Sequence, residues 1–180
     1  MGNERGEALF REPTGPFLDS GQGSGMQDSD MESCMACELA DGGRPLPGGQ
    51  IFRTEYWLVE HCVGPLGLGT LLVKPERHVT SVAALLREEA AELGPLLWRT
   101  SAIAGQIAGA QQTYNCLWSH AGGQPVHIHY VVQPVTAAQM EELQVYGPNL
   151  QVAMFARGEL PVAEDVARIA GEARQLFSKF

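Results

Sequence analysis

Apolar positions along the chain recur first with the period of a strand and later with that of a helix. Short apolar runs bounded by glycine and proline lie at residues 51–54, 56–61 and 70–75, and each predicts a β-strand. From Ser81 onward the spacing becomes helical, and Pro95 inside this stretch is expected to start a new helix or to kink the first. The predicted apolar face of the helix comprises Leu86, Ala90, Leu93, Leu97, Ala104 and Ile107.

The second half of the chain repeats the change of period. Residues 114–119 and 126–135 predict two strands joined by a tight loop at 121–125, after which the pattern is helical again. Pro161 is expected to be the first residue of the last helix. The apolar stripe of that helix is Val162, Val166, Ile169, Ala173 and Phe177. This order predicts an α+β fold, with one antiparallel sheet of about five strands, a long helix packed on it, and C-terminal helices.

Composition divides the chain into three parts. Residues 1–32 are rich in glycine, serine, aspartate and proline without any period, and we expect them to form a flexible leader. Residues 33–135 hold the predicted sheet and long helix. Residues 136–180 are expected to form a helical extension that packs on this domain.

The net charge and hydropathy of the chain argue against nucleic-acid and membrane partners. A formal net charge of −9 argues against broad binding to nucleic acid, although a small phosphate ligand needs only a local pocket. The sequence has neither a membrane-spanning apolar run nor a secretory signal, so we expect no membrane partner and a cytoplasmic location. Its four cysteines are too few for a disulfide scaffold, and Cys62 and Cys116, which stand alone in strand-like segments, are expected to be core thiols.

The most informative stretch for chemistry is Val126-His127-Ile128-His129-Tyr130. Alternate side chains of a strand share a face, so His127 and His129 are expected to lie on the same side. Two solvent-facing histidines on an edge strand would give the same pattern. Gly122 and Gly123 directly upstream favour a ligand site, because backbone amides of a glycine-rich turn can converge on phosphate oxygens, and neutral imidazole is a competent nucleophile.

Three segments between Cys34 and Pro134 together resemble the histidine triad superfamily, and they imply a histidine-triad-like (HIT-like) fold. The segment Cys-Met-Ala-Cys-Glu-Leu at 34–39 resembles the opening of bacterial members. The segment Gly-Thr-Leu-Leu-Val-Lys-Pro-Glu-Arg-His-Val at 69–79 resembles their strand-turn signature, and Gly-Gln-Pro-Val-His-Ile-His-Tyr at 123–130 resembles the His-x-His-x-His motif. The order and spacing of the three segments carry the resemblance.

The resemblance leaves two ways to place the two histidines that the sequence keeps. In the preferred register His127 is the first triad histidine, His129 the second and Val131 stands in the third place. In the other register Pro125 replaces the first, and His127 becomes the second. The middle histidine of the family attacks the α-phosphate, so the preferred register makes His129 the nucleophile.

A zinc site is also implied by the resemblance. Similar bacterial members bind zinc through Cys-x-x-Cys, the histidine after the strand-turn signature and the first triad histidine. The matching residues are Cys34, Cys37, His78 and His127. Two small apolar residues at a helix start, or a redox-active dithiol, are the other interpretations of the cysteine pair.

The function that follows is a nucleotide hydrolase or nucleotidyl transferase acting at the α-phosphate of a dinucleoside polyphosphate or a nucleoside phosphoramidate. The amides of Gly122, Gly123 and Gln124 would hold the phosphate. Asn115 resembles a family residue that contacts the nucleotide, and His120 is either a phosphate contact or a surface residue. Valine in the third triad place opens the alternative of a zinc-stabilised nucleotide-binding or interaction module without turnover. The resemblance also implies a possible homodimer, because members of the family commonly form one. A third possible function is that the C-terminal helices bind another partner.

Overall fold

The structure is a computed structural model that describes residues 34–121 and 124–179. The predicted leader at 1–32 and the residues Gly122 and Gly123 lie outside the described residues. In chain order the elements are α1 (Met35–Ala40), β1 (Gln50–Arg53), β2 (Trp57–His61), β3 (Leu71–Pro75), the short 3-10 helix η2 (Val82–Ala84), α2 (Arg87–Ala108), β4 (Gln112–Ala121), β5 (Gln124–Val135), α3 (Ala137–Leu143), α4 (Pro148–Arg157) and α5 (Ala163–Phe177).

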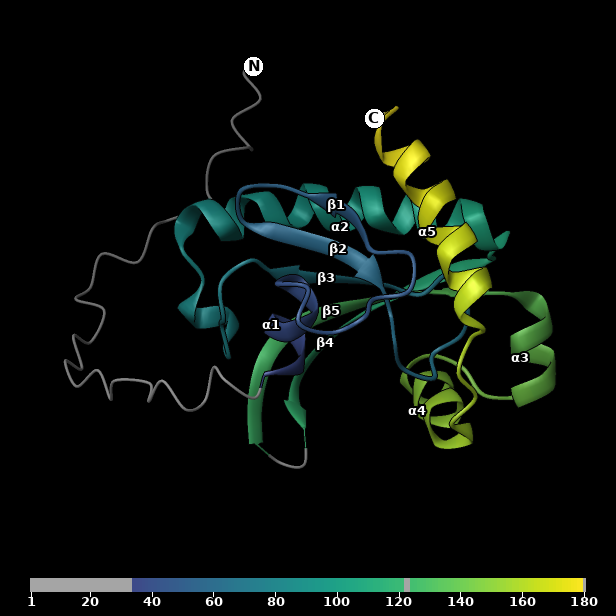
Figure 1. The fold of residues 1–180 in the computed structure, drawn as a ribbon. Coiled ribbons are helices and arrows are strands. Elements are labelled where there is room, and N and C mark those ends of the chain that lie inside the picture. The colour runs from purple at the N-terminus through teal and green to yellow at the C-terminus, as the bar shows by residue number, and fades with distance from the viewer. Residues whose placement is uncertain (1–33, 122–123, 180) are drawn as a thin grey trace, which may run out of the picture.

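A single antiparallel sheet with the strand order β1-β2-β3-β5-β4 forms the centre of the molecule (Figure 1). The long helix α2 packs on one face of the sheet, and α1 lies on the other face (Figure 1). The predicted α+β fold of five strands with a long helix is therefore confirmed. β1 and β4 are the two outer strands of the sheet, and pairing of two chains to form a homodimer stays a prediction.

Strand alternation sends two different sets of side chains to the two faces. Trp57 and Val59 of β2, with Leu71 and Val73 of β3, pack in the core cluster under α2 and α5. The opposite face carries a smaller apolar cluster, in which partly buried Trp118 packs against Cys62, Leu66, Leu72 and Val131. This second face also holds the candidate site.

The long helix differs from its prediction in two ways. A new helix does not start at Pro95, because α2 continues from Arg87 to Ala108, and the alternative of a kink at Pro95 stays a prediction. Pro95 and Ala91 are both exposed, so the carbonyl that loses its helical hydrogen bond can bind water. The predicted apolar face was wrong at its start, where Leu86 and Ala90 are exposed and Glu89 is buried. Glu89 is buried because it accepts from Arg77 and from the backbone amide of Leu86.

The last helix, α5, covers the outer end of the sheet beside α2 (Figure 1). Its buried face includes the predicted Val166, Ile169, Ala173 and Phe177, whereas Val162 is exposed. Pro161 lies two residues before the helix rather than at its first position, because α5 begins at Ala163. The Phe177 ring stacks on Phe52 of β1 with centroids 4.7 Å apart. This aromatic contact stabilises the packing of α5 on the sheet.

The prediction that Cys62 and Cys116 are core thiols can be compared with their burial. Cys62 is buried in the second apolar cluster, as expected for a core thiol. Cys116 is only partly buried, because β4 is an outer strand with one neighbour. Among the described residues, no helix is long and apolar enough to cross a membrane.

Candidate functional site

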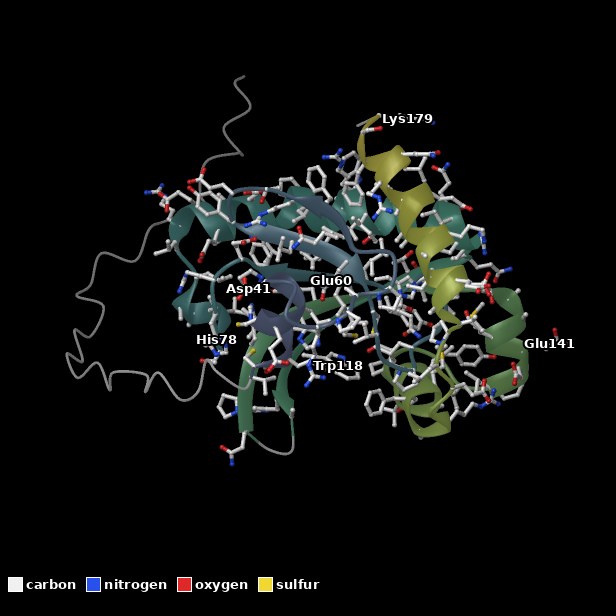
Figure 2. The ribbon with its side chains drawn as sticks, in the orientation of Figure 1. Asp41, Glu60, His78, Trp118, Glu141 and Lys179 are labelled. Atoms are coloured by element: carbon white, nitrogen blue, oxygen red, sulfur yellow. The ribbon has the colours of Figure 1, made fainter. Side chains whose placement is uncertain are left out.

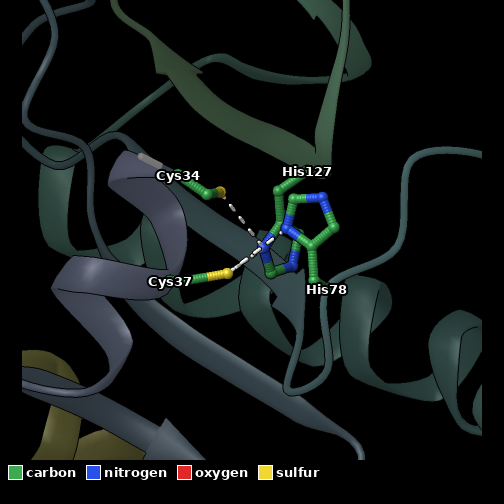
Figure 3. A group of neighbouring side chains, drawn as sticks. All are labelled: Cys34, Cys37, His78 and His127. Carbon is green, nitrogen blue, oxygen red and sulfur yellow. Dashed lines mark hydrogen bonds between the residues drawn. The ribbon is translucent and has the colours of Figure 1, made fainter. Parts of the chain in front are cut away.

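Four side chains from three separate parts of the chain meet on the α1 side of the sheet (Figure 3). Cys34 caps the start of α1 and Cys37 lies in its first turn, His78 follows β3, and His127 belongs to β5. Their ligand atoms all lie within 4.8 Å of one another. The Sγ of Cys37 is 3.3 Å from Nδ1 of His78 and 3.4 Å from Nδ1 of His127, and the Sγ of Cys34 is 3.9 Å from the latter nitrogen.

The spacing of these atoms matches what a tetrahedral zinc ion requires. Zinc binds thiolate sulfur at about 2.3 Å and imidazole nitrogen at about 2.0 Å, so tetrahedral geometry separates a sulfur from a nitrogen by roughly 3.5 Å. The three measured sulfur–nitrogen distances of 3.3, 3.4 and 3.9 Å bracket this value. Two sulfurs and two imidazoles also form one of the common structural zinc sets. The cluster is therefore compatible with zinc.

Hydrogen bonding orients the buried ring of His127. Its Nε2 lies 3.0 Å from the carbonyl oxygen of Pro75, so this nitrogen carries the proton and donates it. The other ring nitrogen, Nδ1, is thereby left with its lone pair toward Cys34 and Cys37, as a metal ligand requires. Burial, and next the neighbouring His78, lowers the pKa of His127 to about 4, which keeps the ring neutral at neutral pH.

The thiol of Cys37 is poised for a cation rather than for redox chemistry. Burial first, and then the hydrogen bond and charge of the neighbouring Cys34, raise the pKa of the Cys37 thiol to about 12. A low pKa would be needed for a reactive dithiol, so this environment argues against the redox interpretation. A metal ion would supply the positive charge that ionises such thiols.

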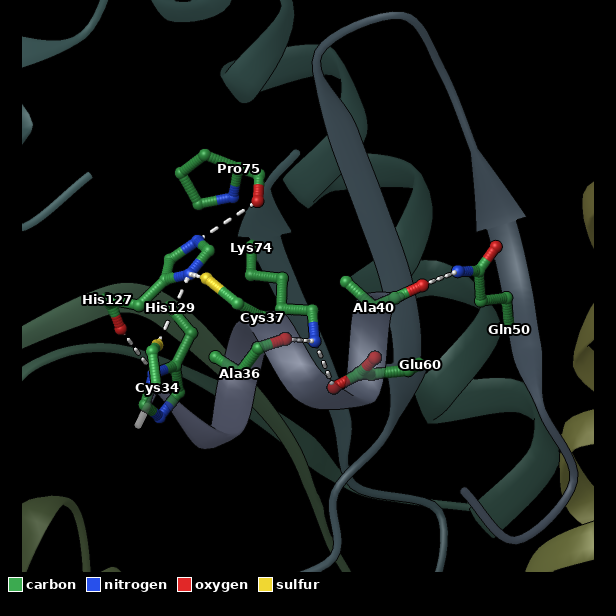
Figure 4. A network of polar contacts seen from close by, with 10 residues as sticks. All are labelled: Cys34, Ala36, Cys37, Ala40, Gln50, Glu60, Lys74, Pro75, His127 and His129. Carbon is green, nitrogen blue, oxygen red and sulfur yellow. Dashed lines mark hydrogen bonds and ion pairs between the residues drawn. The ribbon is translucent and has the colours of Figure 1, made fainter. Parts of the chain in front are cut away.

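His129 lies on the same side of β5 as His127, but it faces a different neighbourhood. Its Nδ1 is 3.2 Å from the carbonyl oxygen of His127, and a proton on Nδ1 would leave Nε2 with a lone pair (Figure 4). Burial is the main cause that lowers the pKa of His129, so the ring is neutral at neutral pH. A neutral imidazole with a free nitrogen is the form that can attack phosphorus.

A cavity of about 1060 Å³ opens beside His129. Trp118 of β4 forms part of its wall, 6.2 Å from the His129 ring between centroids, and Phe155 of α4 packs edge-on against Trp118 at 5.4 Å. Figure 2 shows Trp118 on the β4–β5 hairpin and His78, from a distant part of the chain, beside this hairpin. The cavity thus joins the candidate metal cluster to an apolar wall that includes the C-terminal extension.

The other predicted contacts are distributed unevenly around this cavity. His120 and Gln124 line it, and both are exposed. Asn115 does not line it: the side chain bonds Ser101 of α2 at 3.0 Å, on the opposite face of the sheet. Val131, which the preferred register puts in the third triad place, is fully buried in the second apolar cluster at the wall of the cavity.

Some residues of this region were not singled out by the sequence. Trp118 and Phe155 were missed, because nothing in the pattern brings α4 to this face. Lys74 and Glu60 were also missed, although a lysine and a glutamate in two neighbouring apolar strands are a visible signal. His61 has a structural role: it is buried, and its Nε2 accepts a hydrogen bond from the amide of Gly69 at 2.9 Å.

Comparison with known proteins points to one fold. Among family models and curated protein sequences, none matches the chain. A zinc-bound histidine triad family protein from Mycobacterium smegmatis superposes with a TM-score of 0.60 and 20% identity, over 83% of this chain and 99% of that one. A hypothetical histidine triad nucleotide-binding protein from Sulfolobus tokodaii gives a TM-score of 0.61 at 16% identity, over 81% and 93%.

A third similar structure is an enzyme. The diadenosine triphosphate hydrolase of Plasmodium falciparum superposes with a TM-score of 0.52 and 15% identity, over 72% of this chain and 76% of that chain. Together these likenesses show that the chain has the fold of the histidine triad superfamily.

Proposed function

We propose that this histidine-triad-fold protein is a nucleotide hydrolase or nucleotidyl transferase that acts at an α-phosphate through His129. The observation that carries the proposal is the neutral, carbonyl-oriented imidazole of His129 at the wall of a large cavity. The nucleotide-binding and hydrolase descriptions of the similar structures support the ligand class.

The proposed reaction has two balanced steps. Nε2 of His129 forms a bond to the α-phosphorus while the bond from phosphorus to the leaving group breaks, and the leaving group takes a proton. Water then attacks the same phosphorus and gives its proton back to the group that protonated the leaving group, the nitrogen–phosphorus bond breaks, and a nucleoside monophosphate is released. We propose that the backbone amides of Gly122, Gly123 and Gln124 hold the phosphate oxygens, with His120 as the proton donor nearest to the turn.

We further propose that zinc is the ion held by Cys34, Cys37, His78 and His127. The donor set, the sulfur–nitrogen distances and the zinc-bound similar structure support this assignment. Bound zinc would act structurally, linking α1, the segment after β3 and β5 through closed four-ligand coordination. With His127 committed to the metal, His129 is left as the nucleophile, which supports the preferred register.

The apolar part of the cavity is proposed to receive the nucleoside. Trp118 and Phe155 present aromatic surface to the cavity, and Phe155 remains 49% exposed although it is a large apolar side chain. Planar bases stack on such surfaces. A cavity of about 1060 Å³ has room for more than a mononucleotide, which favours a dinucleoside polyphosphate as substrate.

Turnover of a panel of adenylated compounds tests the enzyme directly. Diadenosine polyphosphates and an adenosine phosphoramidate would be incubated with the wild type, with His129→Ala, and with His120→Ala. The proposal expects AMP release by the wild type, its abolition in His129→Ala, and a slower rate in His120→Ala. Wild-type rates retained by His129→Ala would refute the assignment of the nucleophile.

One observation favours a second function, a nucleotide-binding module without turnover. Val131 offers no proton and no hydrogen bond where the family has a third histidine, and general acid help is typically worth about 10²–10⁴-fold in rate. Binding of AMP by the wild type, with no release from any compound of the panel, would decide for this alternative.

A further inference from the structure

A fully buried ion pair lies beside three of the four residues of the candidate metal cluster, Cys34, Cys37 and His127 (Figure 4). Nζ of Lys74 on β3 is 2.8 Å from Oε1 of Glu60 on β2, and both side chains are 1% exposed. In the strand register Lys74 opposes Leu58 and Glu60 opposes Leu72, so the pair spans the diagonal between two neighbouring strands. Both side chains point to the face that carries α1.

The hydrogen bonding of this ion pair is incomplete, so stabilising the fold does not by itself explain the pair. Burying two charges costs several kcal/mol each, and their attraction offsets this cost only when further hydrogen bonds satisfy both groups. The second carboxylate oxygen of Glu60 is buried and has no hydrogen-bond partner among the described residues. Lys74, in contrast, makes a second hydrogen bond, to the backbone of α1, and this bond indicates the role of the pair.

Nζ of Lys74 donates a hydrogen bond to the carbonyl oxygen of Ala36 at 2.7 Å. Ala36 lies between Cys34 and Cys37, within the turn that presents both thiols. Helix α1 has six residues and buries only Leu39 among them, so its own hydrogen bonds and packing cannot fix its position. Its other tether from the sheet, Gln50 to the carbonyl of Ala40 at 3.0 Å, holds the far end of the helix.

The neighbouring residue on β3 fixes another ligand. The carbonyl of Pro75 accepts from Nε2 of His127 and turns Nδ1 of that ring toward the thiols, and His78 follows three residues later. Three of the contacts that position the cluster therefore come from the end of β3. Lys74 holds the turn with the two cysteines, and Pro75 orients the His127 ring. His78 is positioned because it follows Pro75 by three residues.

We infer that Lys74, held in place by Glu60, is a positioning residue that fixes the Cys34–Cys37 turn for metal binding. Glu60 keeps the Lys74 side chain aimed at Ala36 inside the apolar layer, and the tether to Ala36 sets the distance between the thiols and the two imidazoles. The inference rests on the metal site of the proposed function and extends it to two residues that do not touch the ion. Partners of this kind typically contribute 10–100-fold to metal affinity.

The test uses Co²⁺ as the probe, because thiolate coordination gives it visible and charge-transfer absorption that reports the ligand geometry. Lys74→Met/Glu60→Leu replaces the pair with apolar groups of similar volume, a change that is often neutral for stability. Glu60→Gln removes the charge of the acid but keeps an acceptor for Lys74 and so keeps the tether. Arg168→Gln/Glu172→Gln removes an exposed ion pair on α5 and serves as the matched control.

Competition with a chromophoric chelator should give a Co²⁺ dissociation constant that is about 10–100-fold higher for the double variant, with an altered absorption spectrum and a melting temperature close to that of the wild type. The α5 control should stay within about threefold of the wild type, because it leaves the tether to Ala36 intact. Glu60→Gln, which keeps an acceptor for Lys74 but removes its counter-charge, should weaken Co²⁺ binding less than the double variant does.

Wild-type affinity and spectrum in the double variant would overturn the inference. So would a double variant that fails to fold, because the pair would then support the sheet rather than the turn. If the wild type itself binds no Co²⁺, the metal site fails and this inference with it, so the two failures are distinguishable.

Discussion

The buried histidine of the metal cluster should make the metal-free protein sensitive to mild acid. The pKa of His127 is lowered from 6.5 to about 4, first by burial and then by His78. Below about pH 6.5 the unfolded chain binds a proton at this residue that the folded chain does not bind. The contribution of His127 to stability is therefore fully present above pH 6.5 and is lost as the pH falls toward 4.

The size of this effect follows from the two pKa values. With 6.5 in the unfolded chain and about 4 in the fold, His127 alone removes about 2.5 kcal/mol of the free energy of unfolding at pH 4.5 relative to neutral pH. That is a large share of the roughly 5–15 kcal/mol typical of a domain.

Urea unfolding of chelator-treated protein near neutral pH and again at about pH 4.5 measures the loss. The matched variant is His127→Gln, whose amide can still donate to the carbonyl of Pro75 but cannot titrate. The variant should lose about 2.5 kcal/mol less than the wild type on acidification, whereas His120→Gln, at an exposed position, should behave as the wild type. An equal loss in the wild type and in His127→Gln would refute the reasoning.

Three further predictions concern the C-terminal helices and the metal. Phe177→Ala should lower the free energy of unfolding by about 3–5 kcal/mol in urea titrations, because the ring is 2% exposed and stacked on Phe52; a loss below about 1 kcal/mol would show that α5 is not fastened there. Phe155→Ala should weaken AMP binding by calorimetry about two- to tenfold at an unchanged melting temperature, and unchanged affinity would remove the ring from the nucleoside wall. Chelation should lower the melting temperature of the wild type but not that of Cys37→Ser, and an equal response of the two would contradict a structural metal.

Much of the fold follows from local pattern in the sequence. Two-residue periodicity places His127 and His129 on one side of a strand, and both side chains lie on the α1 side of the sheet. The four side chains of the predicted zinc set also meet, because a spaced motif carries information about distant contacts that local periodicity does not. That they hold a zinc ion, and that His129 reacts with a nucleotide, stay predictions.

The features that could not be predicted depend on contacts between distant segments. Glu89 reads as a surface residue of an amphipathic helix, and it is buried only because Arg77, twelve residues earlier, reaches its carboxylate. Phe155 belongs to a helix beyond the recognisable motifs, so its position in the cavity wall depends on how α4 packs. Asn115 was expected at the nucleotide, but strand parity places its side chain on the α2 face.

The most direct test of the central claim is whether a nucleotide becomes attached to His129. The wild type would be mixed rapidly with a diadenosine polyphosphate, quenched in base, where phosphoramidates survive, and examined by intact-protein and peptide mass spectrometry. The account predicts a transient gain of one AMP on the peptide carrying His129, absent in His129→Ala. Attachment at another residue, or turnover by the wild type together with equal turnover by His129→Ala, would contradict it.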